Sequence, residues 1–293
     1  MQTGTHLKLL FVINPRAGNN NTDWDTVIRE HIAGTGHAAF LFTLPYPCHA
    51  NMVLEKIAEH QPNRVIAVGG DGTLKLVVEA VIDKNILVGL IPGGSANGMA
   101  RELNIPVYAE KALHIAVNGR HQKIDLIRVN DELCIHLSDI GFNAFVVKTF
   151  ESFNARGMWG YIKAAWKVAW RNPRMQVAIA SDTRFVQRDA AMIVLANATK
   201  YGTGATINPE GILDDGLFEI VVIKKIALSE IFKMMISHKP YDPQKTELFK
   251  TSGVQVQSKR KVHFQVDGEY LGKIHTIEAK ILPGAITMIL PDE

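Results

Sequence analysis

Residues 69–73, Gly-Gly-Asp-Gly-Thr, have the composition of a loop that binds phosphate groups. Glycine has no Cβ, so the backbone N–H groups of such a loop can approach phosphate oxygens closely. Asp71 can hold Mg²⁺ or orient an acceptor hydroxyl, and Thr73 can donate its hydroxyl to a phosphate. The Lys-Ser/Thr ending of a Walker A loop is missing. A plain glycine turn with Thr73 as a helix cap is the weaker interpretation, because a buried strand is predicted before the loop and a helix after it.

A second glycine loop occupies residues 92–97, Pro-Gly-Gly-Ser-Ala-Asn, and follows another apolar run. Ser95 and Asn97 open a predicted helix, where hydroxyl, amide and backbone donors can meet an anion. Taken alone, Ser95 is equally well explained as an ordinary helix cap. Together with the first loop, the segment favours a shared site for an anionic ligand.

Two acidic turns lie in the C-terminal half of the chain. Asp267-Gly268-Glu269 follows the alternating run 262–266, which predicts a strand ending in a turn that displays two carboxylates. Asp214-Asp215-Gly216 has a similar form. By residue type alone, both segments favour ordinary Asp-Gly turns over chemical sites.

The first 120 residues alternate between patterns typical of strands and of helices. Strands are predicted at residues 7–13, 38–43, 64–68 and 86–91, and helices at residues 22–32, 51–60 and 74–83. Strict alternation implies parallel strand pairing with helices on both faces of the sheet. A doubly wound sheet places ligands at the carboxyl ends of its strands, where both glycine loops occur. We therefore predict an α/β doubly wound domain over residues 1–120.

Residues 121–284 show a different pattern, dominated by short predicted strands. These strands fall at residues 123–129, 133–138, 175–180, 184–186, 191–196 and 218–223, with further segments later in the chain. The pattern predicts an all-β, sandwich-like or barrel-like second domain. A last strand within residues 285–291 is expected to return to the first domain.

One predicted helix, residues 158–170, interrupts the strands and combines aromatic with basic side chains. Such a composition suits a helix at a membrane interface or the wall of a lipid pocket. However, Trp159, Ile162, Trp166 and Ala169 follow helical spacing, which favours packing on a core.

The composition of the chain excludes some classes of function. The chain has 293 residues, of which 47% are apolar, and a formal net charge of +3, which is too small to argue for nucleic acid. Cys48 and Cys134 lack metal-ligand spacing and are expected to be reduced thiols. Neither a signal peptide nor an apolar run of roughly 18 residues is evident, so we expect a cytoplasmic protein with peripheral membrane contact at most.

Motifs along almost the whole chain resemble those of one group of kinases. Residues 69–73 match a loop shared by diacylglycerol, sphingosine and NAD kinases, and residues 92–101 resemble the Pro-x-Gly-Thr-x-Asn-Asp-x-Ala-Arg segment of the diacylglycerol kinase catalytic domain. Further matches are Asn14-Pro15 with Gly18, Thr43, Asp125, Gly141-Phe142, residues 197–204, Pro209, residues 214–217 and Asp267-Gly268-Glu269. The chain thus resembles the bacterial soluble lipid kinases of the diacylglycerol kinase family, whose fold has the two domains predicted above.

The resemblance implies transfer of phosphate from ATP to the hydroxyl of diacylglycerol or a related lipid, assisted by Mg²⁺. It implies catalytic roles for Glu269, as general base, and for Asp267 and Asp71. The implied nucleotide-binding residues are Asn14, Pro15, Gly18, Thr43, Gly69, Gly70, Asp71, Gly72, Thr73, Ser95 and Asn97. It also implies a structural Mg²⁺ held by Asp215 and the carbonyls of Ile212 and Leu217.

Two departures from the family pattern leave alternatives open. Lys75-Leu76 replace Asn-Glu after the first loop, and Gly98 replaces Asp in the second. Lys75 is a candidate for direct phosphate contact. The alternatives are a kinase for a soluble acceptor such as NAD, whose later motifs are not apparent, and a non-catalytic nucleotide-sensing module. Expected partners are ATP, a lipid and a membrane surface but no nucleic acid; the sequence leaves a homodimer open.

Overall fold

The computed structural model describes residues 6–18, 22–151, 158–169, 174–201, 206–226, 230 and 241–292. The chain forms two compact units, one of Met1–Ile124 with Gly284–Glu293 and the other of Asp125–Pro283. The sequence pattern predicts the corresponding boundaries at residues 120 and 284.

The first unit is built on a parallel sheet. Its strands are β1 (Lys8–Ile13), β2 (Ala38–Thr43), β3 (Arg64–Gly69), β4 (Leu87–Pro92) and the last residues of β14 (Glu269–Leu290). Their order is β14–β4–β3–β1–β2, and every pairing is parallel. β14 joins the sheet where Thr287 pairs with Leu87. β3 is buried along its whole length, as expected for a strand covered on both faces.

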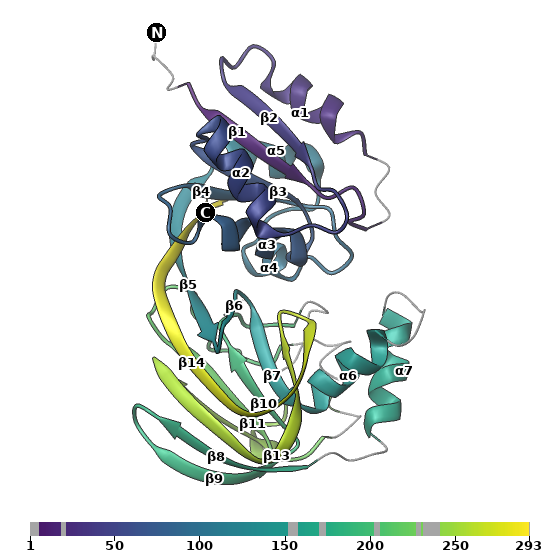
Figure 1. Cartoon of the computed structure of the whole chain (residues 1–293), viewed down its shortest axis with the longest axis vertical. Coiled ribbons are helices and arrows are strands. Elements are labelled where there is room, and N and C mark those ends of the chain that lie inside the picture. The colour runs from purple at the N-terminus through teal and green to yellow at the C-terminus, as the bar shows by residue number, and fades with distance from the viewer. Residues whose placement is uncertain are drawn as a thin grey trace. The chain divides into compact units, whose positions relative to one another are not determined.

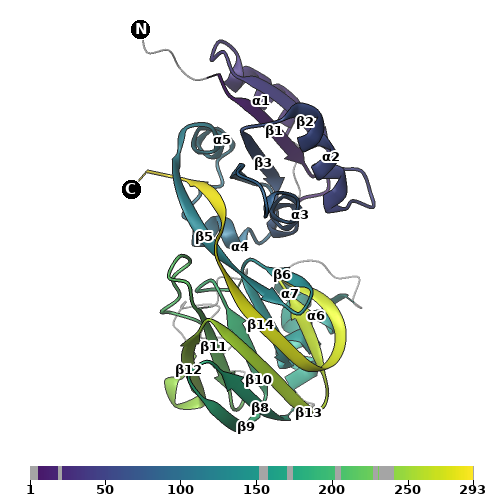
Figure 2. The same ribbon diagram turned by 60° about the vertical axis from the view of Figure 1, so that its left-hand side comes forward.

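Helices cover both faces of this sheet (Figures 1 and 2). They are α1 (Trp24–Ile32), α2 (Ala50–His60), α3 (Asp71–Val81), the short α4 (Gly98–Glu102) and α5 (Ala109–Asn118). α1 packs with α5, where the rings of His31 and His114 meet edge to face at 6.3 Å. α2 packs with α3. The doubly wound α/β fold predicted for this part of the chain is confirmed.

The second unit is rich in antiparallel strands. They are β5 (Arg120–Val129), β6 (Glu132–Cys134), β7 (Leu137–Gly141), β8 (Met175–Ser181), β9 (Phe185–Ala190), β10 (Met192–Ala196), β11 (Phe218–Ile223), β12 (Thr246–Thr251), β13 (Gly253–Val266) and β14. The main path runs β12–β11–β10–β7–β13–β14, while β8 and β9 attach to β13, and β5 and β6 attach to β14. A short 3₁₀ turn, Pro243–Lys245, precedes β12.

Two apolar clusters show how this unit is layered. Ile193 and Leu195 of β10 lie in one cluster with residues of β8 and β13. Met192 and Val194, which point to the other face of β10, lie in a second cluster with residues of α6 (Phe142–Glu151) and α7 (Met158–Ala169). β10 is therefore buried on both faces, between a layer of strands and a pair of helices, and the predicted β-sandwich-like domain is confirmed.

β13 changes neighbours along its length. Residues 254–258 pair with β8, whereas residues 264–266 pair with β7. Between them the register against β14 shifts: Gln257 pairs with Thr276 and Val262 with Ile274, so residues 258–261 stand opposite His275 alone. A bulge of this kind lets one strand leave one sheet partner and join another.

Two predicted elements differ from the structure. The strand predicted at residues 133–138 is split into β6 and β7, because the backbone N–H groups of Ile135 and His136 bind the carboxylate of Asp267 instead of a neighbouring strand. The helix α6 was not predicted. Its residues Phe142 and Val146, one helical turn apart, are buried in the second apolar cluster, which shows that helical spacing governs this segment.

The helix predicted at residues 158–170 is present as α7, but its buried face differs from the predicted one. Ala164, Ala165 and Val168 are buried, whereas Trp166 is 50% exposed. Small residues at the contact allow α7 to approach α6 closely, and the large ring faces solvent. The side chains of Trp159, Ile162 and Ala169 lie outside the described set. None of the helices described here is long and apolar enough to cross a membrane.

Candidate functional site

Three loops meet at the carboxyl edge of the parallel sheet, after β1, β3 and β4. The N–H of Asn14 donates to the carbonyl of Val68 at 3.0 Å, and the N–H of Gly93 donates to the carbonyl of Gly69 at 2.8 Å. The side chain of Asn14 donates from Nδ2 to Oγ1 of Thr73 at 3.1 Å. The sheet thus brings together Asn14, residues 69–73 and residues 92–97, as the sequence led us to expect.

Glycine is required where these loops touch. A Cβ on Gly94 would lie 2.6 Å from the Cα of Gly70, and a Cβ on Gly18 would lie 2.5 Å from the carbonyl oxygen of Gly93. Gly18 also has a φ of +65°, which favours glycine. Gly72, in contrast, has open space at its Cβ position. The close backbone approach places peptide groups side by side at the helix N-termini, the arrangement in which backbone N–H groups can bind an anion.

Asp71 connects the two glycine loops. Its Oδ2 accepts a hydrogen bond from the N–H of Gly98 at 2.8 Å, and its Oδ1 accepts one from Met99 at 2.9 Å. These are N–H groups in the first turn of α4, which the side chain therefore caps from a distance of 27 residues in the chain. The contact fixes the second loop relative to the first; Mg²⁺ binding or hydroxyl orientation by Asp71 stays a prediction.

Asn97 braces the second loop from within. Its Oδ1 accepts from the N–H of Gly94 and its Nδ2 donates to the carbonyl of Gly94, both at 2.8 Å. Its φ of 51° lies in the left-handed region, which asparagine tolerates better than most residues. Ser95, which lies between Gly94 and Asn97 in the chain, is exposed, so its hydroxyl can reach a ligand.

A hollow of about 480 Å³ opens beside these loops. Its lining is formed by Gly18, Thr22, Trp24, Pro92, Gly93, Gly94, Ser95, Asn97, Val107 and Ala109. The volume and the mixture of apolar surface with backbone groups suit a small organic ligand with phosphate groups. Sequence reasoning missed Trp24 and Val107; the aromatic type of Trp24, shortly after Gly18, was the one available signal.

The remaining predicted nucleotide-binding residues, Asn14, Pro15, Thr43 and residues 69–73, do not line this hollow. Pro15 lies in the exposed turn after β1, and Thr43 is the exposed last residue of β2, paired with Ile13. Lys75 is 9% exposed within α3 and is not part of the lining, so it gives no support to direct phosphate contact.

In the second unit, Asp267 binds the segment between β6 and β7. Its Oδ2 accepts from the N–H of Ile135 at 2.9 Å, and its Oδ1 accepts from His136 at 2.9 Å and Leu137 at 3.2 Å. A hydrogen bond from a backbone N–H group to a charged carboxylate is stronger than one to a neutral acceptor. The carboxylate therefore holds the acidic turn against the sheet, and its predicted catalytic role stays a prediction.

Glu269 is the exposed first residue of β14, on the same turn. The turn itself is tied down by Gln265, whose Oε1 accepts from the N–H of Gly268 at 2.7 Å. Gln265 in turn donates from Nε2 to Oδ2 of the fully buried Asp139 at 2.5 Å. An exposed carboxylate on a braced turn is suited to accept a proton from a bound hydroxyl.

Burial raises the pKa of Asp139 to about 6. Hydrogen bonds from Asn143, Gln265 and Tyr201 favour the charged form and oppose this shift, but the cost of burying the charge is larger. The sequence did not single out this carboxyl group, because nothing local to it indicates that a distant glutamine reaches it.

The second acidic turn holds a lysine. Oδ2 of Asp215 lies 2.8 Å from Nζ of Lys250, while its Oδ1 accepts from the N–H of Leu217 at 3.0 Å. The same ammonium lies 3.4 Å from the buried carboxylate of Glu219. Hydrogen bonding to Asp215 raises the pKa of Lys250 above its usual value.

The expected structural Mg²⁺ does not fit this arrangement. A divalent cation needs the carboxylate of Asp215 together with the carbonyls of Ile212 and Leu217, but the ammonium of Lys250 already neutralises that carboxylate and would repel the metal. The cation at this turn is the side chain of Lys250.

Comparison with known families now defines the class of protein. Residues 8–129 match the model of the diacylglycerol kinase catalytic domain, and residues 139–290 match that of the YegS C-terminal NAD kinase beta sandwich-like domain. An α/β catalytic domain followed by a β-sandwich-like domain is the plan of a lipid kinase-like protein. The chain belongs to the family that carries the YegS C-terminal NAD kinase beta sandwich-like domain, and its first unit matches the diacylglycerol kinase catalytic domain.

Individual relatives agree with this assignment. The chain is 29% identical to the "Probable lipid kinase YegS" of Escherichia fergusonii over 239 residues, which are 78% of each chain. It is 26% identical to the uncharacterized protein sll0036 of a Synechocystis species over 306 residues, covering 96% of this chain and 70% of the relative. A crystal structure of a diacylglycerol kinase from Bacillus anthracis has a TM-score of 0.74 at 20% identity, with coverage of 98% and 97%, which shows the shared fold.

Proposed function

We propose that the protein transfers the γ-phosphate of ATP to the hydroxyl of diacylglycerol or a related lipid. The observation that carries the proposal is the convergence of two glycine loops and the N-terminus of α3 beside a hollow of about 480 Å³. Phosphoryl transfer needs positioning and charge stabilisation more than covalent help from the protein, and loops rich in backbone N–H groups supply both. Membership of a lipid kinase-like family supports a lipid as the acceptor.

Within this proposal the first unit binds the nucleotide. The N–H groups at the start of α3 and that of Ser95 face the phosphates, with the exposed hydroxyl of Ser95 as an additional donor, whereas the N–H groups of Gly93 and Gly94 donate within the loops. Trp24 and Val107, which line the same hollow, provide apolar surface for the base. Mg²⁺ would arrive with ATP and neutralise the phosphate charge, and Asp71 holds both loops in register.

The acceptor hydroxyl gives its proton to Glu269 in this proposal. The side chain is exposed and therefore accessible to a substrate, while the turn that carries it is braced by Asp267 and Gln265. We thus assign Glu269 the role of general base and Asp267 the role of positioning residue.

The test is an assay of the purified full chain with radiolabelled ATP and Mg²⁺. Diacylglycerol, a sphingoid base and other long-chain alcohols are offered in parallel with NAD as a soluble acceptor. We expect labelled lipid and no labelled NAD, with Glu269→Gln reducing turnover by about 10²-fold or more and leaving ATP binding unchanged. Turnover with NAD alone would reassign the acceptor. Tight ATP binding without transfer to any acceptor would instead favour a nucleotide sensor.

A further inference from the structure

The second unit contains a hollow of about 390 Å³ whose charged lining residues are all cations. The lining consists of Gly141, Arg174, Met175, Gln176, Ala191, Ser258, Lys259, Arg260, Lys261, Val262 and His263. Four of these carry a fixed positive charge, Arg174 and the consecutive residues 259–261, and none is acidic. A concave surface lined by one sign of charge concentrates ligands of the opposite sign.

The bulge of β13 creates this hollow. Residues 259–261 lie where β13 leaves β8 and joins β7, and no strand of the described chain is paired with them on that side. The bulge carries Lys259, Arg260 and Lys261 outward, and all three are exposed. Gly141 and Ala191 pack closely in the lining. A Cβ on Gly141 would lie 2.5 Å from the carbonyl oxygen of Ala191, so only glycine fits at this position.

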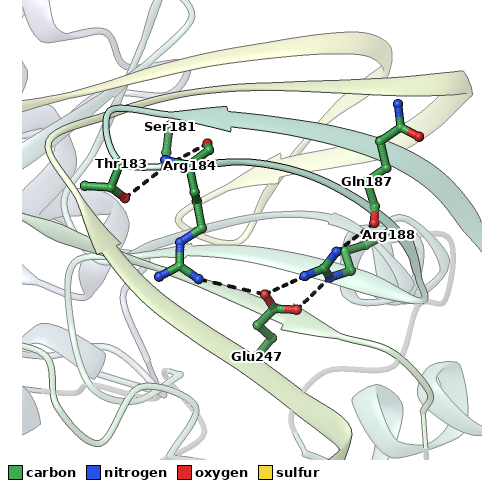
Figure 3. A network of polar contacts seen from close by, with 6 residues as sticks. All are labelled: Ser181, Thr183, Arg184, Gln187, Arg188 and Glu247. Carbon is green, nitrogen blue, oxygen red and sulfur yellow. Dashed lines mark hydrogen bonds and ion pairs between the residues drawn. The ribbon is translucent and has the colours of Figure 1, made fainter.

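These cations are not neutralised within the described structure. Neither Arg174 nor any residue of the bulge forms an ion pair with a described residue. A nearby arginine shows the contrast: Arg188 of β9 binds Glu247 of β12 through two hydrogen bonds of 2.7 and 2.9 Å, with Arg184 beside them (Figure 3). Arg188 is thus paired with a carboxylate, whereas the cations of the bulge can bind an external anion.

Two further features describe the ligand that this hollow suits. Its lining includes the apolar residues Met175 and Ala191, which are buried, and Val262, which is partly buried. Ser258, which is 4% exposed, also lines it, and its hydroxyl has no hydrogen-bond partner among the described residues. A buried hydroxyl without a partner is costly. Buried apolar residues beside exposed cations match an amphiphile with a phosphate group better than a free phosphate ion.

His263 is a partly buried residue of the lining. Burial, together with Lys273 and Lys148, lowers the pKa of its ring to about 4. The neutral ring stacks on Phe145 at 4.3 Å and shares a hydrogen bond of 2.8 Å with the hydroxyl of Tyr270. The ring therefore carries no charge near neutral pH.

We propose that this hollow binds the phosphate of an anionic phospholipid at a bilayer surface, and so attaches the second unit to membranes. Clusters of four or more Lys and Arg residues are attracted to the negative surface potential of anionic leaflets, and each added cation strengthens the attachment. The site is separate from the ATP hollow and from the turn of Glu269, so it predicts membrane attachment without ATP and without turnover.

Sedimentation with lipid vesicles tests the proposal on the full chain. One set of vesicles contains phosphatidylcholine alone, and the other contains equal amounts of phosphatidylcholine and phosphatidylglycerol. We expect binding to the second set alone, and a loss of about tenfold or more in the variant Lys259→Ser/Arg260→Ser/Lys261→Ser. The matched control, Lys84→Ser/Lys225→Ser/Lys280→Ser, removes the same charge from exposed positions elsewhere and should bind as the unmodified protein does.

Several outcomes would overturn the proposal. Equal binding to both sets of vesicles, or unchanged binding by the triple bulge variant, would remove the role of these cations. If the bulge variant fails to fold by circular dichroism, Arg174→Ser alone replaces it, and unchanged binding by that variant counts against the site. A rise in Tm with inorganic phosphate, in a protein that ignores both vesicles, would reassign the hollow to a soluble phosphate. Because Asp71→Ala should bind vesicles normally, failure here is distinct from failure of the kinase proposal.

Discussion

Nε2 of Gln265 donates to Oδ2 of Asp139 at 2.5 Å, and this bond joins a fully buried carboxyl group to the turn that carries Glu269. Both polar atoms of the Gln265 amide form hydrogen bonds, since its Oε1 accepts from the N–H of Gly268 at 2.7 Å. The position of the turn therefore depends on a polar contact inside the core. Low dielectric surroundings strengthen such contacts and make their loss costly.

Replacing Gln265 by leucine should loosen the acidic turn. The variant loses both hydrogen bonds and leaves Asp139 with one donor fewer, so we expect the free energy of unfolding to fall by about 2–3 kcal/mol. Lipid kinase turnover should fall at least about tenfold, with the KM for ATP unchanged, because the nucleotide hollow lies in the other unit. Chemical denaturation and steady-state kinetics measure the two effects. Gln257→Leu, at an exposed position of the same strand, is the control, and equal effects of both variants would contradict the positioning role.

Stability should depend on pH through Asp139. Its pKa is about 6 in the folded protein, above its ordinary value of 3.8, so between these values the unfolded chain releases a proton that the folded protein retains. The contribution of this group is thus fully present below pH 3.8 and is lost as pH rises through 6. We expect the loss to be on the order of 2–3 kcal/mol. Urea unfolding at a series of pH values should show this loss in the unmodified protein and not in Asp139→Asn.

The control for the pH experiment is Asp131→Asn, which removes an exposed carboxylate of the same unit. It should retain the full pH dependence of the unmodified protein. A pH profile of Asp139→Asn that is identical to that of the control would show that another group titrates.

Removing the carboxylate of Asp71 should uncouple the two glycine loops. Asp71→Ala releases the N–H groups of Gly98 and Met99 at the start of α4, so we expect a loss of about 1 kcal/mol in stability. ATP turnover should be abolished while circular dichroism shows an intact fold. Asp71→Asn, which retains one acceptor, should keep part of the ATP affinity measured by calorimetry. Asp83→Ala, at an exposed position after α3, should change neither property, and retained turnover in Asp71→Ala would refute its role.

Chelation should leave the stability of the protein unchanged, because Lys250 provides the cation at Asp215. We expect the Tm measured without nucleotide to be the same in Mg²⁺ and in EDTA. Lys250→Met leaves the carboxylates of Asp215 and the buried Glu219 without their cation, so this variant should be destabilised and should regain stability when Mg²⁺ is added. A fall in the Tm of the unmodified protein on adding EDTA would show that a metal is present after all.

Much of the fold was predictable because its signals are local. Buried strands such as residues 64–68 are continuous apolar runs, and the glycine loops follow them directly, so the sheet and the position of its loops could be inferred from adjacent residues. The overlooked helix α6 shows the limit of this approach. Its apolar residues fit either a strand or a helix, and the second apolar cluster decides between them.

Residue types and their order in the chain determined two things: the two-domain α/β and β-sandwich-like plan, and the placing of glycine loops and acidic turns at strand ends. Tertiary structure alone decided what the charged groups of those segments contact. Asp71 reaches α4, Asp267 reaches residues 135–137 and Lys250 reaches Asp215, across separations of 27 to 132 residues. Local patterns select secondary structure because their interactions lie within a few residues. A carboxylate and its hydrogen-bond partner can be this far apart in the chain. Their pairing is then decided only when packing brings separate segments together.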